Sequence, residues 1–380
     1  MGGGLMQLVA YGAQDIYLTG NPQITFFKVV YRRHTNFAME AIEQTPSGSL
    51  SAGSRQSYTI SRNGDLVHRL YIEETTAVDD ILNPGSNSID VVEFEIGGQL
   101  IDRHYGHWME VWAELTEPNP SGHTGISNAN TGTLFQNMSA MGGMKGNAQA
   151  RKAYVPLQFS FCRNPGLALP LIALQYHEVK ILITWNSVTT STPSLATLYA
   201  DYIYLDTDER RRFAQVSHEY LIEQVQHQTL GNKATNDINF NHPVKELVWS
   251  GTVDTTTGIR TDTITTADKT WKLKLNGHDR FAARHATYFT RTQVWQHHTG
   301  AGGLDSSATQ GVGNCDDSIA VYSFALKPEE HQPSGTCNFS RIDNAQLVCS
   351  AIPGDAGNLY AVNYNVLRIM SGMGGLAYSN

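Results

Sequence analysis

The residues with the greatest capacity for chemistry are fourteen histidines, because imidazole is both a common metal ligand and an acid–base group. Three pairs lie close together in the sequence: His104 and His107, His278 and His285, and His297 and His298. None of them forms the H-x-H or H-E-x-x-H spacing, or the Cys/His quartet, that metal sites use. We therefore interpret these histidines as packing or surface residues and predict no metal site.

Other patterns that carry catalysis are also missing or incomplete. There is no G-x-S-x-G nucleophile elbow, and Gly142–Gly146 (GGMKG) lacks the spacing of a phosphate-binding P-loop. The carboxylate pairs Asp79–Asp80 and Asp316–Asp317 lie in loop-like segments and indicate no acid–base pair. We predict no catalytic or cofactor-binding residue and no enzyme. The alternative, an enzyme of the cupin or glycoside-processing type, requires a metal or two carboxylates that converge inside one barrel.

Composition and charge favour a folded globular protein. Hydrophobic residues make up 41% and charged residues 16% of 380 residues, which is typical of a packed globular chain. The net charge of −8 gives no general attraction to nucleic acid.

The cysteines form no C-x-x-C pair, so we expect reduced thiols at Cys162, Cys315, Cys337 and Cys349. The sequence has no secretory signal and no membrane-spanning run, so the sequons at Asn137 and Asn338 are predicted to be unused.

The elements that must position any site are mostly short strands. Runs rich in β-branched and aromatic residues alternate with turn-forming segments, which is typical of sandwiches and barrels. The predicted strands are Phe26–Tyr31, Gln56–Ile60, Leu66–Glu73, Ser88–Ile96, Val155–Phe161, Val179–Trp185, Lys245–Trp249, Thr270–Leu275, Ala320–Leu326 and Tyr360–Met370. One short helix is predicted over His107–Leu115, because Trp108, Val111, Trp112 and Leu115 follow helical spacing.

Two phrases occur twice in the same order. Phe94–Gly98 (FEIGG) and Leu273–Gly277 (LKLNG) both alternate into a hairpin turn, and Asp-Arg follows each one. Further on, Phe159–Pro165 (FSFCRNP) and Tyr322–Pro328 (YSFALKP) are both predicted to be a strand followed by a turn. These echoes predict a duplicated domain. The charge cluster at 206–212 lies between the copies and is interpreted as a connector.

The first 24 residues contain one charged side chain, Asp15, and place Leu5, Leu8 and Val9 where they can form an apolar helical turn. Such an uncharged arm is expected to dock on another surface. Residues 252–266 and 296–318 are expected to be long surface loops, where binding specificity can lie.

Several of these segments together resemble a known family. The blocks are Gly12–Pro22 (GAQDIYLTGNP), Ile24–Phe37 (ITFFKVVYRRHTNF), Leu169–Val179 (LPLIALQYHEV), Ser340–Asn344 (SRIDN) and Tyr360–Ile369 (YAVNYNVLRI). They are similar to the major capsid proteins of nucleocytoplasmic large DNA viruses. Because the blocks extend from one end of the chain to the other, the resemblance covers both predicted domains.

The resemblance implies an all-β fold of two tandem eight-stranded antiparallel jelly rolls with few short helices. The expected division is an N-terminal arm at 1–24, a first jelly roll at 25–206, a linker at 207–212 and a second jelly roll at 213–380. In this family three copies form a pseudo-hexameric capsomer that tiles an icosahedral shell. The implied partners are the chain itself, neighbouring capsomers, and minor capsid proteins and an internal membrane on the side of the arm.

The same resemblance implies a location in the virion capsid after assembly in the host cytoplasm, with no direct contact to nucleic acid. Host glycans at the outer loops are a further expected partner. The alternative is a capsid paralogue or a glycan-binding virion surface protein with the same fold. The loops after Trp249 and Trp295 are short for the family, which argues against elaborate outer towers.

Overall fold

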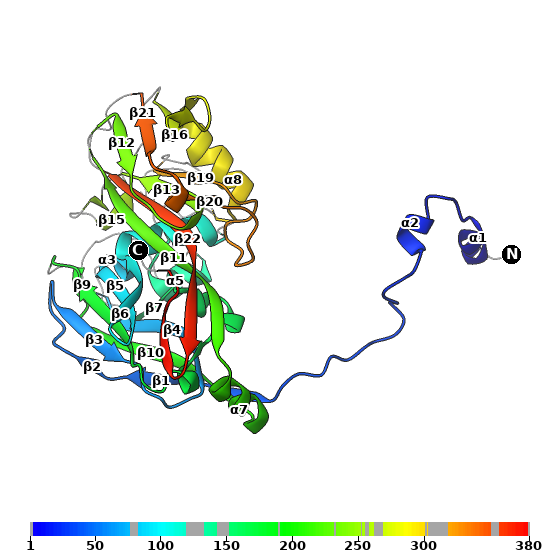
Figure 1. The fold of residues 1–380 in the computed structure, drawn as a ribbon, viewed down its shortest axis with the longest axis horizontal. Coiled ribbons are helices and arrows are strands. Elements are labelled where there is room, and N and C mark those ends of the chain that lie inside the picture. Colours follow the sequence, from blue (N-terminus) through cyan, green and yellow to red (C-terminus); the bar gives the residue numbers. More distant parts are fainter. Residues whose placement is uncertain are drawn as a thin grey trace. The chain divides into compact units, whose positions relative to one another are not determined.

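From Phe37 onward the chain is built mainly of antiparallel strands that alternate between buried and exposed residues. The computed structural model describes residues 3–76, 83–118, 133–142, 152–188, 191–231, 233–251, 253–254, 258–261, 269–300, 302, 318–350 and 357–378. Contacts between Cα atoms divide the chain into two units, Met1–Asn36 and Phe37–Asn380. Figure 1 shows the strands of the second unit.

The first barrel consists of two facing sheets. One has the order β1-β10-β4-β7 and the other the order β2-β3-β9-β5-β6. The strands are β1 Phe37–Gln44, β2 Pro46–Ser47, β3 Arg55–Thr59, β4 Leu66–Thr75, β5 Ile89–Ile96, β6 Gln99–Tyr105, β7 Lys152–Pro156, β8 Leu169–Pro170, β9 Val179–Trp185 and β10 Leu195–Leu205. The short β8 pairs with β4 at the margin of the first sheet.

The second barrel repeats this arrangement. Its sheets have the orders β11-β22-β13-β19 and β12-β21-β16-β17. The strands, with three short additions, are β11 His218–Leu230, β12 Thr235–Ile238, β13 Pro243–Ser250, β16 Thr270–Leu275, β17 His278–Asp279, β18 Arg284–His285, β19 Ile319–Ser323, β20 Cys337–Asn338, β21 Ala345–Cys349, β22 Gly357–Met370 and β23 Met373–Leu376. In both barrels the first strand pairs with the last long strand, as a jelly roll requires. The predicted duplication and the all-β double jelly roll are confirmed.

The hairpin echo marks equivalent corners of the two barrels. Gly97 and Gly98 connect β5 to β6, and Asn276 and Gly277 connect β16 to β17. All four residues have positive φ, between 50° and 82°, as a type I′ turn needs. A Cβ added at Gly97 would lie 2.5 Å from the ring of His177, so this position also lacks room for a side chain.

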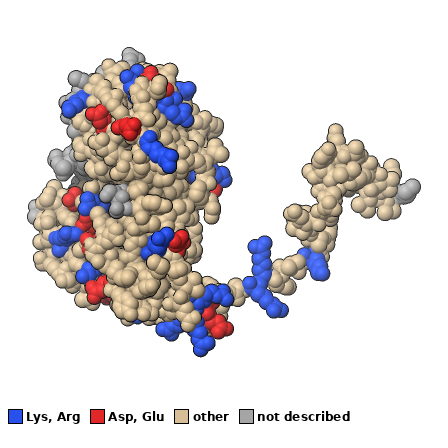
Figure 2. All heavy atoms as spheres, in the orientation of Figure 1, with Lys and Arg blue, Asp and Glu red and all other residues tan. Residues whose placement is uncertain are grey.

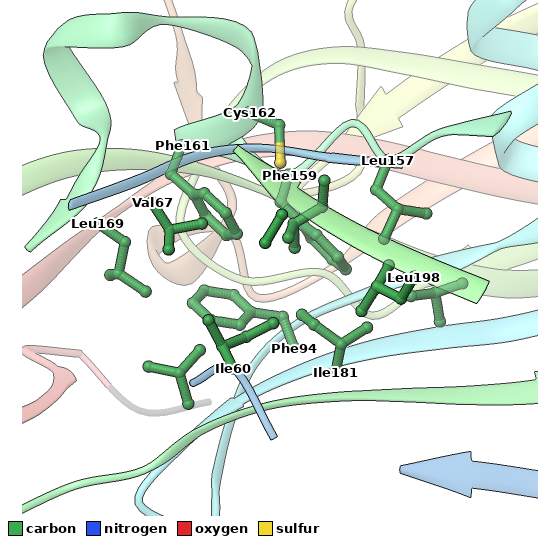
Figure 3. Packing of buried hydrophobic residues seen from close by; sticks show 14 of the residues in the cluster. Ile60, Val67, Phe94, Leu157, Phe159, Phe161, Cys162, Leu169, Ile181 and Leu198 are labelled. Atoms are coloured by element: carbon green, nitrogen blue, oxygen red, sulfur yellow. The ribbon is translucent and has the colours of Figure 1, made fainter. Parts of the chain in front are cut away.

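The core of the first barrel is formed by alternate residues of the facing sheets (Figure 3). In β9 the burial strictly alternates, with Val179, Ile181 and Ile183 pointing inward. The ring of Phe94 contacts those of Phe159 and Phe161, with centroids 5.5 and 5.0 Å away. Aromatic packing of this kind contributes about 0.5–1.5 kcal/mol per pair beyond the area that it buries.

Helices occupy the connections between strands. In the first barrel and the connector they are α3 Pro84–Asn87, α4 Gly106–Thr116, α5 Leu134–Ser139, α6 Ser160–Arg163, η1 Pro165–Leu167, η2 Leu171–Ala173 and α7 Thr207–Gln215. In the second barrel they are the π-helical turn η4 Tyr288–Thr292, α8 Gln293–His297 and η5 Phe339–Arg341. The predicted helix at 107–115 is confirmed as α4. The charge cluster at 206–212 forms most of α7, where Asp206 accepts a hydrogen bond from the Thr207 amide at 2.8 Å.

Three strand predictions are wrong or too long. Residues 26–31 form no strand, and the first strand of the barrel is β1. Strand β7 ends at Pro156 instead of reaching Phe161, because proline has no N–H to continue the ladder; residues 160–163 turn into α6. Strand β19 ends at Ser323, before Leu326. The first copy of the aromatic phrase follows β7, whereas the second begins within the last two residues of the equivalent strand β19.

The N-terminal unit has little structure of its own. It contains the short helices α1 Gly3–Val9 and α2 Ile16–Thr19, and α1 includes the predicted apolar turn. None of the helix residues is buried, and Phe27, Tyr17 and Leu18 are 97%, 91% and 86% exposed. Figure 2 shows that the surface of this arm is largely uncharged. Among the described residues, no helix is both long and apolar enough to span a bilayer.

Candidate functional site: the seam between the two barrels

The two barrels meet through α4, which leaves the first barrel after β6 and lies on the second barrel. Met109 and Ala113 of α4 point into the core of the first barrel. The opposite face, with Trp108, Val111, Trp112 and Leu115, packs on strands of the second barrel. We call this contact the seam. Because the helix is buried on both faces, it belongs equally to both barrels.

The second barrel receives α4 with the outer face of its sheet β11-β22-β13-β19. Val248 of β13, Val321 of β19, and Tyr360 and Val362 of β22 point toward the helix, and all four are at most 1% exposed. The residues between them point into the core of the second barrel, for example Leu247. Burial on both faces explains why all but the first residue of β13 are buried.

A buried cluster of charges lies beside the seam. Glu223 of β11 forms ion pairs with Arg163 of the first barrel and, at 2.7 Å, with Lys245 of β13. His331 is 3.6 Å from the same carboxylate. Burial by itself would raise the pKa of Glu223, but the Arg163, His331 and Lys245 side chains lower it to about 2. The carboxylate therefore stays ionised, and its pair with Arg163 joins the two barrels.

A second polar cluster fixes the segment that follows α8. His298 lies 2.9 Å from Glu246 of β13 and 3.0 Å from Glu329 through its two ring nitrogens. Burial lowers the pKa of His298, yet the two carboxylates outweigh this effect and raise it to about 9. The imidazolium contacts the ring of Trp112 edge-on, with centroids 6.5 Å apart. The Arg163 guanidinium lies over the same Trp112 ring at 5.1 Å, so both charge clusters contact the seam at this tryptophan.

The histidine pairs of the sequence are separated by the fold. His104 contacts Asp102 at 2.9 Å and stacks on Phe159. His107 instead lies 2.8 Å from the Tyr360 hydroxyl, and burial lowers its pKa to about 3. His278 and His285 are exposed on separate short strands. Within the described residues, no three His, Cys, Asp or Glu side chains are grouped as a metal ion would require.

Other expected features have simple places. Cys162 and Cys337 are free thiols, and Cys349 is buried. In the charged segment at 206–212, Arg210 forms an ion pair with Asp65 at 3.0 Å and Arg212 forms one with Glu209 at 3.5 Å. Residues 143–146 of the glycine loop, Cys315 and the carboxylate pairs Asp79–Asp80 and Asp316–Asp317 lie outside the described residues.

The charge cluster at the seam was not predicted from the sequence. Lys245 was assigned to a strand, but nothing in the pattern placed it beside Glu223, which is 22 residues away. Arg163 lies in the first aromatic phrase, and that phrase was interpreted only as a strand and turn. One signal was available in the sequence: Lys245 and Glu246 lie inside an otherwise apolar predicted strand, and buried charges need partners.

Family comparisons cover nearly the whole chain. Residues 25–208 match the family described as "Major capsid protein N-terminus", and residues 209–375 match "Large eukaryotic DNA virus major capsid protein". The chain belongs to the major capsid proteins of large eukaryotic DNA viruses. The predicted family is thereby confirmed, and the chain is a structural component of a virion capsid.

Individual relatives align with this chain over their full lengths. The chain is 54% identical to the major capsid protein of Pyramimonas orientalis virus and 42% identical to that of Paramecium bursaria Chlorella virus 1, with complete coverage of both chains in each case. The alignments extend over 406 and 467 positions, whereas this chain has 380 residues. Both relatives therefore carry insertions relative to this chain.

Solved structures show the same fold. A quasi-atomic model of the PBCV-1 virus capsid matches with a TM-score of 0.76 at 37% identity, covering 94% of this chain and all of the other. The Faustovirus major capsid protein matches with a TM-score of 0.62 at 13% identity, covering 95% of this chain and 94% of the other, so it supports the fold alone. The first of these structures belongs to an assembled virus capsid.

Proposed function

We propose that this major capsid protein acts as a homotrimer whose six barrels form a pseudo-hexameric capsomer, and that such capsomers tile an icosahedral shell. The observation that carries the proposal is the repeated strand order of two barrels held in one body by the seam. Closed rings of identical chains are the usual form of soluble oligomers. Three copies of a duplicated barrel give a six-sided unit, which packs without gaps in a hexagonal lattice.

The rigidity of the seam supports this proposal. Barrels joined by a flexible linker would move independently, whereas a large apolar interface suppresses relative motion. Burial of each large apolar side chain contributes about 1.5–3 kcal/mol, and Trp108, Val111 and Leu115 are each at most 2% exposed. A fixed angle between the barrels is what a lattice with constant spacing needs.

We also propose the domain division that the sequence suggested: an arm at 1–24, a first jelly roll at 25–206, a linker at 207–212 and a second jelly roll at 213–380. In support, β10 ends at Leu205 and β11 begins at His218. We change one boundary of this division and propose that residues 25–36 also belong to the arm, because the contacts divide the chain after Asn36.

The arm is proposed to contact minor capsid proteins and an internal membrane. Its support is the series of exposed apolar side chains, including Leu8 at 77% and Phe26 at 87%, because exposed apolar groups in a folded chain mark a contact surface. Assembly in the host cytoplasm and glycan recognition by the outer loops are proposed on the family resemblance alone. Direct nucleic-acid contact is not proposed; on the face shown in Figure 2, basic and acidic residues of the body are interspersed.

Light scattering after size exclusion tests the oligomer directly. We expect a particle of about three times the 41.9 kDa chain mass. A mass of one chain at every accessible concentration would contradict the capsomer proposal. A chain lacking residues 1–36 is the matched control: it should keep the trimer mass and lose binding to vesicles, because the arm is a separate unit.

A further inference from the structure

The duplication has produced a second copy of the seam helix. Helix α4 follows β6 and precedes β7; η4 and α8 form a continuous helix at 288–297 that follows β17 and β18 and precedes β19. Strands β17 and β18 both pair with β16, as β6 pairs with β5. The two helices therefore occupy the same place in the two barrels.

The inner faces of the two helices are alike. Phe289 is fully buried in the core of the second barrel, just as Met109 is buried in the core of the first. Gln293 is buried as well, and its side chain accepts a hydrogen bond from the Ser323 amide at 3.2 Å. Each helix is thus fixed to its own barrel by one face.

The outer faces differ. In α4 the residues at i, i+3, i+4 and i+7 from Trp108 are covered by the second barrel. The same spacing in the second helix gives Tyr288, Arg291, Thr292 and Trp295, which are half-buried or exposed. Trp295 is 81% exposed, whereas the other five tryptophans are at most 6% exposed. Figure 1 shows α8 at the margin of the second barrel.

The surface that would receive this helix also exists in the first barrel. Strands β4, β10 and β7 have the places in their sheet that β13, β22 and β19 have in the second. Their outer face forms a hollow of about 570 Å³ that is lined in part by Arg69, Tyr71, Phe135, Tyr154, Pro156 and Asp201. Three of the lining side chains are aromatic: Tyr71, Phe135 and Tyr154. Tyr154 is 40% exposed.

Charge favours the same pairing. Arg284 stacks over the ring of Tyr288 at 4.2 Å, and Arg291 lies on the same helix. The hollow contains the carboxylates of Asp201 and Glu117 against one cation, Arg69. A basic helix and a mildly acidic hollow attract each other.

We propose that the helix at 288–297 of one copy docks on the outer face of β4, β7 and β10 of a second copy, with Trp295 as the anchor in the hollow. In this contact a helix of one chain packs on the outer face of a sheet in the next chain, as α4 packs on the second barrel within one chain. Tryptophan is a frequent anchor of interfaces, because it fills a pocket with little loss of side-chain entropy. The inference rests on the proposed trimer and names its interface.

Photo-crosslinking of the full-length chain is the primary test. A benzophenone amino acid replaces Trp295, and the crosslinked peptides of the oligomer are identified by mass spectrometry. We expect links between chains to residues 69–73, 152–158 or 197–201. Links between chains that map only outside these segments would overturn the proposed interface, even if the particle is a trimer.

Dissociation of the oligomer is the second measurement. Trp295→Ala and Tyr154→Ala should each raise the dissociation constant by about 30-fold, the effect of removing an interface anchor. The double variant should be little weaker than either single variant, because the two side chains share one contact. Tyr176→Ala is the matched control: this tyrosine is 76% exposed but does not line the hollow.

The outcomes separate this inference from the trimer itself. A wild-type trimer whose dissociation is unchanged by Trp295→Ala and Tyr154→Ala overturns the interface and leaves the capsomer proposal standing. A wild-type chain that stays monomeric overturns both. A crosslink to the hollow together with weakened variants supports both.

Discussion

The helices α4 and 288–297 hold equivalent places in the two barrels but have opposite surroundings. Both bury one face in their own barrel, through Met109 in α4 and Phe289 in the second helix. The outer face of α4 is buried with Trp108 and Trp112, while that of the second helix exposes Trp295. Duplication within one chain can satisfy only one of two equivalent contacts, so the other remains for a neighbour.

The difference also shows in the polar groups. Beside α4 the charges are buried and paired across the barrels, as Glu223 and Arg163 are. On the outer face of the second helix the charge lies at the surface, as with Arg284 on Tyr288. A permanent internal contact can include buried ion pairs whose partners are always present. A surface that must first exist alone in water needs its charges solvated.

The largest effect is expected at the outer face of α4. Trp108→Ala should lower the free energy of unfolding by about 3–5 kcal/mol, because it removes a ring that is 2% exposed and leaves a cavity in the seam. Urea denaturation measures this change. A loss below about 1 kcal/mol would mean that the seam is not a packed interface, and the comparison between the helices would fail.

The next largest effect concerns the charges at the seam. Glu223→Gln should lower the free energy of unfolding by about 3 kcal/mol, because it leaves the buried Lys245 and the half-buried Arg163 without their counter-charge. Denaturation of the variant beside Glu219→Gln, in the same strand but in an exposed ion pair with Arg368, gives the matched contrast. Equal costs for the two variants would show that burial of the cluster contributes nothing.

A pH dependence is expected from His298, which links the two helices. Its pKa of about 9 in the folded chain is above the value of about 6.5 for an unfolded imidazole. The stabilisation is therefore complete below about pH 6.5 and is lost as pH rises through about 9. Unfolding free energies measured from pH 6 to 10 should fall more steeply for wild type than for His298→Gln. Parallel curves would show that the imidazolium is not stabilised by Glu246 and Glu329.

The smallest effect is expected at Trp295. Measured on dissociated chains, Trp295→Ala should change the unfolding free energy by less than about 0.5 kcal/mol, as is usual for exposed residues. Phe289→Ala, in the same helix but fully buried, should cost about 3–5 kcal/mol. Similar losses for both would indicate that Trp295 packs within its own chain, and the contrast with α4 would disappear.

Much of the fold follows from local sequence. Strand β9 and strand β16 have the predicted boundaries, because alternation and turn residues define them. Strands β1, β10 and β11 were not predicted. In β11, Glu223, Gln224 and Gln226 interrupt the apolar pattern; they are accommodated by partners in distant segments, such as Ile101 and Asn363.

The sequence by itself determined the duplicated β architecture, the hairpin corners and the helical spacing of α4, because each depends on residues close together in the chain. Only the tertiary structure decided that the outer face of α4 is covered and that the outer face of the helix at 288–297, with Trp295, is exposed. It also decided that Glu223 meets Arg163. These outcomes depend on which surfaces of the two barrels face each other, and this is set by contacts between residues far apart in the chain, as between His107 and Tyr360.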